Sequence, residues 1–159
     1  MVELDALSAR AMAKRKTCEI ESTAYTLWLS LLMPANLILV VGAGLLSLVA
    51  GASLLVDQQI ISKTTTGLMA LISSAFTLIH TRLKCDEHQA ECRKLQSFYR
   101  GLAEEYANLE TEADPTEFKT RLDSLNNSLA QVRKEISAYP SQRSYAKAKR
   151  IVESSYAQA

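Results

Sequence analysis

Cysteine and histidine side chains that share one face of a predicted helix are the residues best suited to bind a metal ion. Cys85, His88 and Cys92 follow one another at spacings of three and four, which places them on one helical face. Thiolate and imidazole groups bind zinc, but a tetrahedral site needs a fourth ligand from elsewhere. The same positions also suit core packing, because a buried cysteine behaves as a small hydrophobic residue. Both interpretations stay open, and we assign no metal-binding residue.

His80 is the second titratable group that the sequence singles out. It lies near the end of an apolar stretch, where a histidine could act as a protonation switch or could simply sit at a membrane interface. The sequence contains no Gly-rich phosphate loop, no Ser/His/Asp arrangement and no paired carboxylates in an apolar setting. We therefore predict no catalytic residue, no cofactor-binding residue and no enzyme activity.

The elements that position these groups are organised around a long apolar stretch, residues 22–56. About 35 residues here carry no charged side chain, whereas roughly 20 apolar residues already cross a bilayer. A core helix of a soluble domain would show a polar face at helical spacing, and this stretch shows none. We therefore predict a first membrane span from about Leu27 to Val56. Tyr25 and Trp28 are expected at the membrane interface.

A second and shorter span is predicted from about Thr64 to Thr81, after a polar hairpin from Asp57 to Lys63. Polar and small residues recur along this span at spacings of four and three and so share one face: Thr66, Ala70, Ser73, Thr77 and His80. Such a stripe would either line the wet lumen of a pore or pack against the first span.

The first span also carries residues suited to helix–helix contact. Asn36 is a lone amide in an apolar setting and is expected to bond across to another helix. Ala43, Ser47 and Gly51 recur at intervals of four, a pattern of small residues that lets two helix backbones approach closely.

The distribution of lysine and arginine predicts the orientation of the two spans. Basic residues flank the pair of spans on both outer sides: Arg10, Lys14, Arg15 and Lys16 before it, and Arg82, Lys84, Arg93 and Lys94 after it. The hairpin carries only Lys63. By the positive-inside rule both termini are cytoplasmic, and we expect a multi-pass membrane protein.

Beyond Arg82 the apolar pattern becomes that of soluble helices. One heptad seam comprises Cys85, His88, Cys92, Leu95, Tyr99, Leu102, Tyr106 and Leu109. After a helix start at 114–117, a second seam comprises Phe118, Leu122, Leu125, Leu129, Val132, Ile136 and Tyr139. Two such seams predict an antiparallel helical hairpin. Pro140 should stop the second helix, and Ser141 should cap a last one with Tyr145, Ala148 and Val152 on one face.

The predicted fold is therefore an all-α membrane protein, with a two-transmembrane helical hairpin and a cytoplasmic antiparallel helical hairpin. We expect one unit over residues 1–159, made of a basic juxtamembrane helix at the lipid headgroups (1–21), the membrane hairpin (22–81) and the cytoplasmic helical region (82–159). The basic segment 143–150 suits lipid headgroups or plain solvation. It lacks the stacking aromatics of a nucleic-acid site beyond Tyr145, so no nucleic-acid partner is expected.

This layout resembles the SLATT family, the two-transmembrane effector domains associated with SMODS nucleotidyltransferases and SLOG proteins in bacterial anti-phage systems. The resemblance covers nearly the whole chain and includes Tyr-x-x-Leu patterns at Tyr99–Leu102 and Tyr106–Leu109. It also includes an ending in which Pro140 is followed by Tyr145, Ala148 and Lys149. The family implies a membrane effector that forms a pore or disrupts the inner membrane and so causes abortive infection. Its implied trigger is a nucleotide second messenger, or a partner protein that senses nucleotides or is a nucleotidyltransferase.

Two spans cannot enclose a water path, so a pore requires a homo-oligomer in the lipid bilayer, for which the seams and small-residue faces are suitable. The alternative is a non-conducting membrane scaffold, in which the coiled-coil-like cytoplasmic helices recruit a partner and the spans only anchor.

Overall fold

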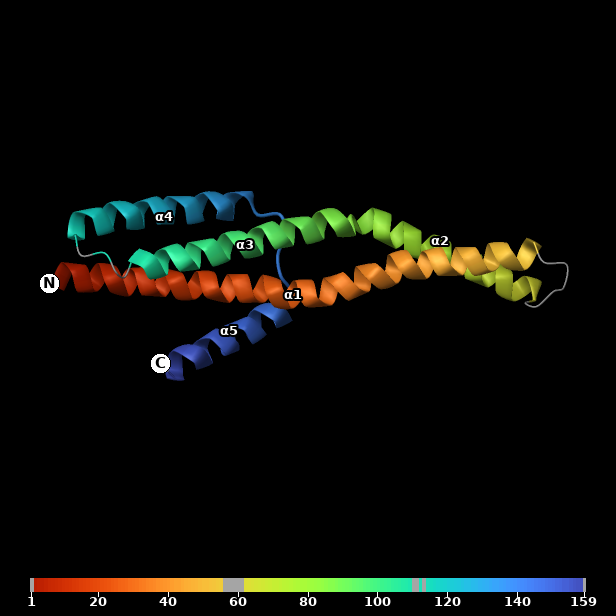
Figure 1. Cartoon of the computed structure of the whole chain (residues 1–159), viewed down its shortest axis with the longest axis horizontal. Helices are drawn as coiled ribbons and strands as arrows, with labels where there is room; N and C mark the ends of the chain where they lie inside the picture. The colour runs from red at the N-terminus through yellow and green to blue at the C-terminus, as the bar shows by residue number, and fades with distance from the viewer. Residues whose placement is uncertain (1, 56–61, 110–111, 113, 159) are drawn as a thin grey trace. The chain divides into compact units, whose positions relative to one another are not determined.

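The computed structural model describes residues 2–55, 62–109, 112 and 114–158, and most of the predicted hairpin lies outside them. Five helices make up nearly all of the described chain (Figure 1): α1 (Val2–Leu55), α2 (Lys63–Leu83), α3 (Cys85–Leu109), α4 (Pro115–Glu135) and α5 (Gln142–Gln158). No strand occurs among the described residues. The all-α class is therefore confirmed.

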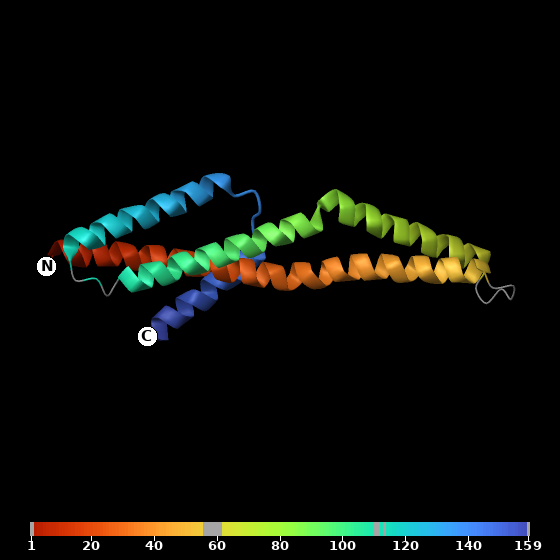
Figure 2. The same ribbon diagram turned by 45° about the horizontal axis from the view of Figure 1, so that its top comes forward.

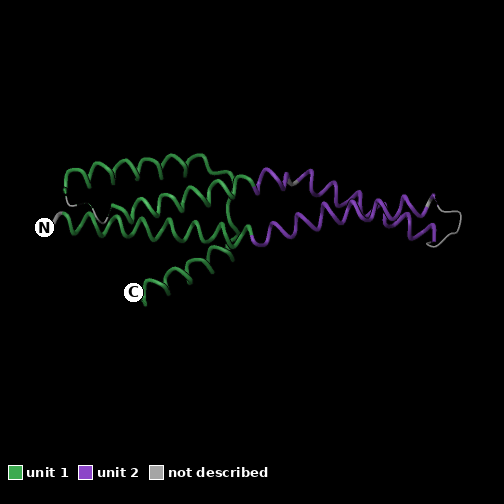
Figure 3. Tube along the Cα trace, in the orientation of Figure 1, with its two compact units in different colours: residues 1–29, 90–159 green, residues 30–89 purple. Residues whose placement is uncertain are grey.

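The chain divides into two compact units (Figure 3). Unit 1 comprises Met1–Leu29 and Ala90–Ala159, and unit 2 comprises Ser30–Gln89. Helix α1 continues from one unit into the other, because residues 2–55 form a single helix. Each unit has its own packing, described separately below.

Unit 1 is built on the first half of α1 together with α3 and α4. Ala11, Cys18 and Tyr25 are buried at intervals of seven along α1. The Tyr25 ring stacks on that of Tyr99 in α3, with centroids 6.0 Å apart and planes inclined by 15°. Part of the segment 1–21 thus packs into the core of unit 1, and its expected place at the lipid headgroups stays a prediction. Tyr25, expected at the membrane interface, is only 1% exposed.

The two predicted heptad seams form most of the remaining core of unit 1. From Cys92 to Leu109 every predicted seam residue of α3 is buried, as are Phe118, Leu122, Leu125 and Leu129 of α4. The start of α4 is also confirmed, since the Asp114 side chain accepts a hydrogen bond of 3.0 Å from the Thr116 N–H and Pro115 occupies the first turn.

The end of α4 differs from the prediction. The seam was expected to continue to Tyr139, but α4 ends at Glu135 and Tyr139 is 65% exposed. Contacts outside the helix explain the early end, because the Ser137 hydroxyl donates to a Glu91 carboxylate oxygen of α3 at 2.6 Å. The next carbonyl, that of Ala138, accepts a hydrogen bond from Tyr25. Both bonds require an extended chain that a continued helix would not offer.

Helix α5 packs along the first half of α1, on the side away from α4 (Figures 1 and 2). A small apolar cluster joins the two helices: Ile20, Ala24, Ala148 and Val152, with Leu27 and Tyr156 at its edge. The predicted cap is present, because Ser141 Oγ accepts from the Ser144 N–H at 3.2 Å. The buried face is Ser144, Ala148 and Val152, so Tyr145 was predicted on it wrongly; a spacing of four describes the contact better.

Unit 2 consists of the second half of α1, helix α2 and the first turn of α3. Ser62 caps α2, accepting from the Thr65 N–H. Lys84 directly follows α2, adopts a left-handed conformation with φ 45° and donates its N–H to the Thr81 carbonyl. This residue separates α2 from α3, because one left-handed residue ends a helix by satisfying a terminal carbonyl.

The outer surface of unit 2 is apolar. Large hydrophobic side chains are exposed on both of its long helices: Leu31, Met33, Leu37, Ile38, Val40, Val41, Leu45, Leu48, Val49, Leu55, Leu68, Leu71, Ile72, Leu78 and Ile79. Among the described helices, α1 alone is long and apolar enough to cross a membrane, with a window of mean hydropathy 2.2 of which 6% is buried. Hydroxyl side chains and His80 make α2 less apolar, so the second span stays a prediction.

Candidate functional site

The polar stripe of α2 contacts α1 within unit 2 through Ser73. Ser73 is 4% exposed and donates a hydrogen bond of 2.8 Å to the Ala43 carbonyl. The Ser47 and Ser73 hydroxyl oxygens lie 2.6 Å apart. Because the single hydroxyl proton of Ser73 goes to Ala43, Ser47 is the donor in this second bond.

A second hydroxyl contact lies about two helical turns earlier in α2. Thr66 is 7% exposed, and its hydroxyl lies 3.1 Å from that of Ser53 in α1. Ala70 and Thr77 are exposed at the margin of the stripe, and Thr77 donates to the Ser73 carbonyl of its own helix. The structure thus brings Thr66 and Ser73 against α1 and leaves Ala70 and Thr77 beside the contact, while His80 is described below.

An open groove runs between α1 and α2 at this contact. Its volume is about 270 Å³, and its polar lining comes from Ser47 of α1 and from Ser73, Thr77 and His80 of α2. Ala43 and Gly44 add small residues to the α1 side of the groove. The groove therefore brings three hydroxyl groups and one imidazole of unit 2 together among apolar and small residues.

The predicted packing face of α1 is only partly in this contact. Ala43 is buried and Ser47 is hydrogen-bonded, but Gly51 is exposed, and a Cβ at that position would meet nothing within 4 Å. Instead Ala50 is buried. Gly42 faces Phe76 of α2, and a Cβ added at Gly42 would lie 3.3 Å from the Phe76 ring. Burial at positions 43 and 50 follows the seven-residue repeat of two α-helices that cross with a left-handed supercoil. In the sequence, the spacing of four among Ala43, Ser47 and Gly51 obscured this repeat.

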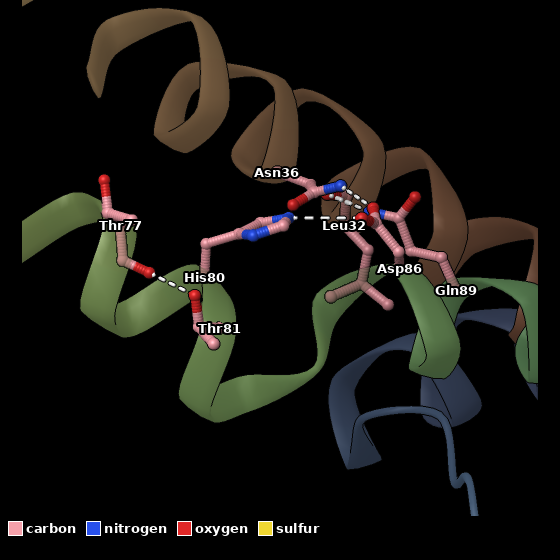
Figure 4. Close-up of polar contacts among 7 residues, drawn as sticks. All are labelled: Leu32, Asn36, Thr77, His80, Thr81, Asp86 and Gln89. Carbon is pink, nitrogen blue, oxygen red and sulfur yellow. Dashed lines mark hydrogen bonds and ion pairs between the residues drawn. The ribbon is translucent and has the colours of Figure 1, made fainter. Parts of the chain in front are cut away.

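Asn36, His80 and Asp86 meet where the three helices of unit 2 converge (Figure 4). Asn36 Nδ2 of α1 donates to Asp86 Oδ1 of α3 at 2.7 Å. The expectation that Asn36 bonds to another helix is thus confirmed. Next to it, Gln89 Nε2 of α3 donates to the Leu32 carbonyl of α1 at 3.0 Å. These two hydrogen bonds hold the beginning of α3 against α1.

His80 completes this cluster from α2. Its Nε2 lies 3.3 Å from Asp86 Oδ2, close enough for an ion pair when the imidazole is protonated but not aligned for a hydrogen bond. The Asn36 Oδ1 atom is likewise buried with no hydrogen-bond partner among the described residues. Asp86 therefore touches both neighbouring helices, and its contact with His80 depends on the charge of the imidazole.

The cysteine–histidine motif of α3 is divided between different environments. Cys92 is fully buried in the core of unit 1, where desolvation raises the pKa of its thiol, whereas Cys85 is half-buried. Among the described residues no three His, Cys, Asp or Glu side chains are grouped as metal ligands would be. The packing interpretation therefore fits Cys92.

Comparison with known proteins adds no assignment to this geometry. No protein-family model matches the sequence, and neither a curated protein nor a solved structure matches it. The resemblance to the SLATT family therefore stays a prediction based on the sequence.

Proposed function

We propose that this chain is a membrane effector of a bacterial anti-phage system. In this proposal unit 2 crosses the inner membrane twice, both termini lie in the cytoplasm, and a homo-oligomer opens or disrupts the membrane when a nucleotide signal or a partner protein triggers it. Unit 1 is the part that receives the trigger, and the chain performs no enzymatic reaction. The proposal takes its biological setting from the resemblance to the SLATT family.

The observation that carries the proposal is the contrast between the outside of unit 2 and its groove. The outer side chains are large and apolar, which suits hydrocarbon. The groove gathers Ser47, Ser73, Thr77 and His80, groups that are costly in contact with lipid tails and useful on the wall of a water-filled path. A purely anchoring pair of helices does not need this concentration of polar groups.

In this proposal the described protomer is the resting state. Ser73 is bonded to Ala43 and Ser47, so its hydroxyl is satisfied within one chain. To line a lumen the stripe must turn away from α1 and exchange these bonds for water. Interhelical hydrogen bonds in membranes are worth only about 0.6 kcal/mol on average, so a trigger of modest energy is sufficient.

Dye leakage from liposomes tests the proposal. The purified chain carrying Ser47→Ala and Ser73→Ala loses the contact that holds the stripe, and we expect it to leak faster than the parent chain. Ser74→Ala is the matched control, because Ser74 is exposed on α2 and donates to the Ala70 carbonyl of its own helix. Leakage that is insensitive to a charged or bulky residue at positions 73 and 77 would remove the lining role.

The second candidate function is a non-conducting membrane scaffold. The satisfied hydroxyls of Ser73 and Thr66 favour it, since they make the stripe a complete helix–helix contact without any lumen. Membrane potential in cells distinguishes the two functions. An effector depolarises the membrane when it is triggered or when the Ser47/Ser73 contact is removed, whereas a scaffold leaves the potential unchanged in both cases.

A further inference from the structure

The first turn of α5 lies beside the end of the α1 segment that belongs to unit 1. Tyr25 Oη donates a hydrogen bond of 2.8 Å to the Ala138 carbonyl, three residues before α5 enters its cap. At the other end of α5, Lys16 Nζ lies 5.6 Å from the centroid of the Tyr156 ring. Helix α5 therefore runs antiparallel to α1. Its beginning follows the chain segment that is bonded to Tyr25 of unit 1.

One side of α5 is exposed and basic. Arg143, Lys147 and Arg150 follow one another at spacings of four and three, and all three are exposed, so they share a face of the helix. Ile151 at its border is 45% exposed, and Tyr139 just before the helix is 65% exposed. We call these five residues the α5 basic face. It combines cations with an exposed aromatic ring and an exposed aliphatic side chain.

The charge on this face is not explained by the stability of α5 itself. The first turn of α5 contains no acidic residue, and cations near a helix N-terminus oppose the helix dipole. The ion pair on α5, between Lys149 and Glu153 at 4.0 Å, includes none of these three basic residues. Within the described part of the chain, Arg143, Lys147 and Arg150 have no acidic partner. Their charge is thus available to an anion outside the chain.

We propose that the α5 basic face binds anionic lipid headgroups on the cytoplasmic surface of the membrane. Clustered basic side chains next to a span are attracted to the negative surface of that leaflet, and a tyrosine ring is stable at the headgroup level. The proposal rests on the membrane anchoring of unit 2 proposed above. It adds a second membrane contact, one that releases when the charge is reversed or screened by salt.

Quenching of a single indole by brominated lipids tests the proposal. Trp28 is the only tryptophan, so the full chain with Trp28→Phe and Tyr139→Trp carries one probe, on the α5 basic face. The chain is reconstituted in vesicles of phosphatidylcholine alone or of a roughly two-to-one mixture with phosphatidylglycerol, each with brominated acyl chains. We expect strong quenching in the mixed vesicles, little in the neutral ones, and reversal by high salt.

The charge variants identify the residues responsible. Arg143→Glu with Lys147→Glu should reduce quenching in the mixed vesicles to the level of the neutral ones. Lys119→Glu with Lys134→Glu makes the same change of charge at exposed positions of α4 and should leave quenching unchanged. Circular dichroism of each variant verifies that the helices are retained.

Each other outcome overturns a definite part of the account. A chain that floats with the vesicles but shows no quenching, or equal quenching in both lipids, is anchored without the headgroup contact and contradicts this inference alone. A chain that does not float contradicts the anchoring of unit 2. Binding of single-stranded DNA by the detergent-solubilised chain that is lost in Arg143→Glu/Lys147→Glu assigns the face to nucleic acid and also overturns the inference.

Discussion

Ser47 of α1 donates a hydrogen bond to Ser73 of α2 across 2.6 Å, and Ser73 in turn donates a hydrogen bond to the Ala43 carbonyl. These two hydrogen bonds join α1 and α2 of unit 2 at the groove that the polar side chains line. The polar stripe therefore has a defined partner within the protomer. In the pore proposed above, the stripe lines the lumen only after this contact breaks, so the contact would control opening.

The close approach of α1 and α2 depends on a small residue at position 43. Ala43 is 8% exposed, so Ala43→Leu overfills the contact and should destabilise the chain by about 1–3 kcal/mol. Gly51→Leu is the control, because nothing lies within 4 Å of a Cβ at that position. Thermal unfolding in detergent, followed by circular dichroism, measures both. A larger loss for the Gly51 variant would contradict the packing.

The bond between Tyr25 and Ala138 should contribute measurably to the stability of unit 1. Tyr25→Phe keeps the ring stacked on Tyr99 but leaves the Ala138 carbonyl, which is part of a fully buried residue, without its donor. We expect a loss of about 1 kcal/mol. Tyr139→Phe is the matched control, because Tyr139 is exposed and its hydroxyl is 3.4 Å from its acceptor. Equal denaturation midpoints for the two variants would disprove the role of the bond.

Asp86 should couple α1 to α3. Asp86→Ala removes the acceptor of Asn36 Nδ2, and we expect a loss of about 1 kcal/mol, reduced by the exposure of the carboxylate. Glu87→Ala, which breaks an exposed pair with Lys84, should have a smaller effect. A double-mutant cycle of Asn36→Ala and Asp86→Ala in detergent measures the coupling. A coupling energy of zero would show that the two side chains act independently.

Unit 1 should lose stability at alkaline pH through Cys18. Burial raises the pKa of this thiol from 9.0 to about 11. Above pH 9 the unfolded chain releases the proton while the folded chain retains it, so the stability present below pH 9 is lost as the pH approaches 11. Burial also raises the pKa of Tyr106 to about 12, so the loss of stability continues as the pH rises above 11.

Urea unfolding at several pH values measures this dependence. Cys18→Ala should flatten the decrease between pH 9 and 11, whatever its effect on stability at neutral pH. Cys85→Ala is the comparison, because Cys85 is only half-buried. An unchanged slope in the Cys18 variant would show that the folded chain does not protect this thiol.

The seams of α3 and α4 were predictable because large apolar residues recur there at heptad spacing. Leu95, Tyr99 and Leu102 in α3, and Phe118 and Leu122 in α4, are buried as expected. The core position of the first half of α1 was not predicted, since its seam consists of Ala11 and Cys18 with charged residues between them. Small residues give a weak hydrophobic pattern even where they are fully buried.

The details of the candidate site depended on three-dimensional contacts that spacing does not reveal. Asn36 was expected to bond to another helix, but its partner, Asp86, lies 50 residues away in sequence. The hydrogen bonds from Ser47 through Ser73 to Ala43 likewise require the crossing geometry of α1 and α2. Sequence periodicity identified which residues share a face, and the structure identified what that face meets.

The central claim is that lipid surrounds unit 2 and that both ends of the chain share the cytoplasm. Fusion of a reporter enzyme that is active only in the periplasm measures this directly, with one fusion at Ala159 and one in the hairpin after Gln59. We predict activity from the hairpin fusion alone, with both products in the membrane fraction. Activity from the Ala159 fusion, or a chain that remains soluble and monomeric without detergent, would contradict the account.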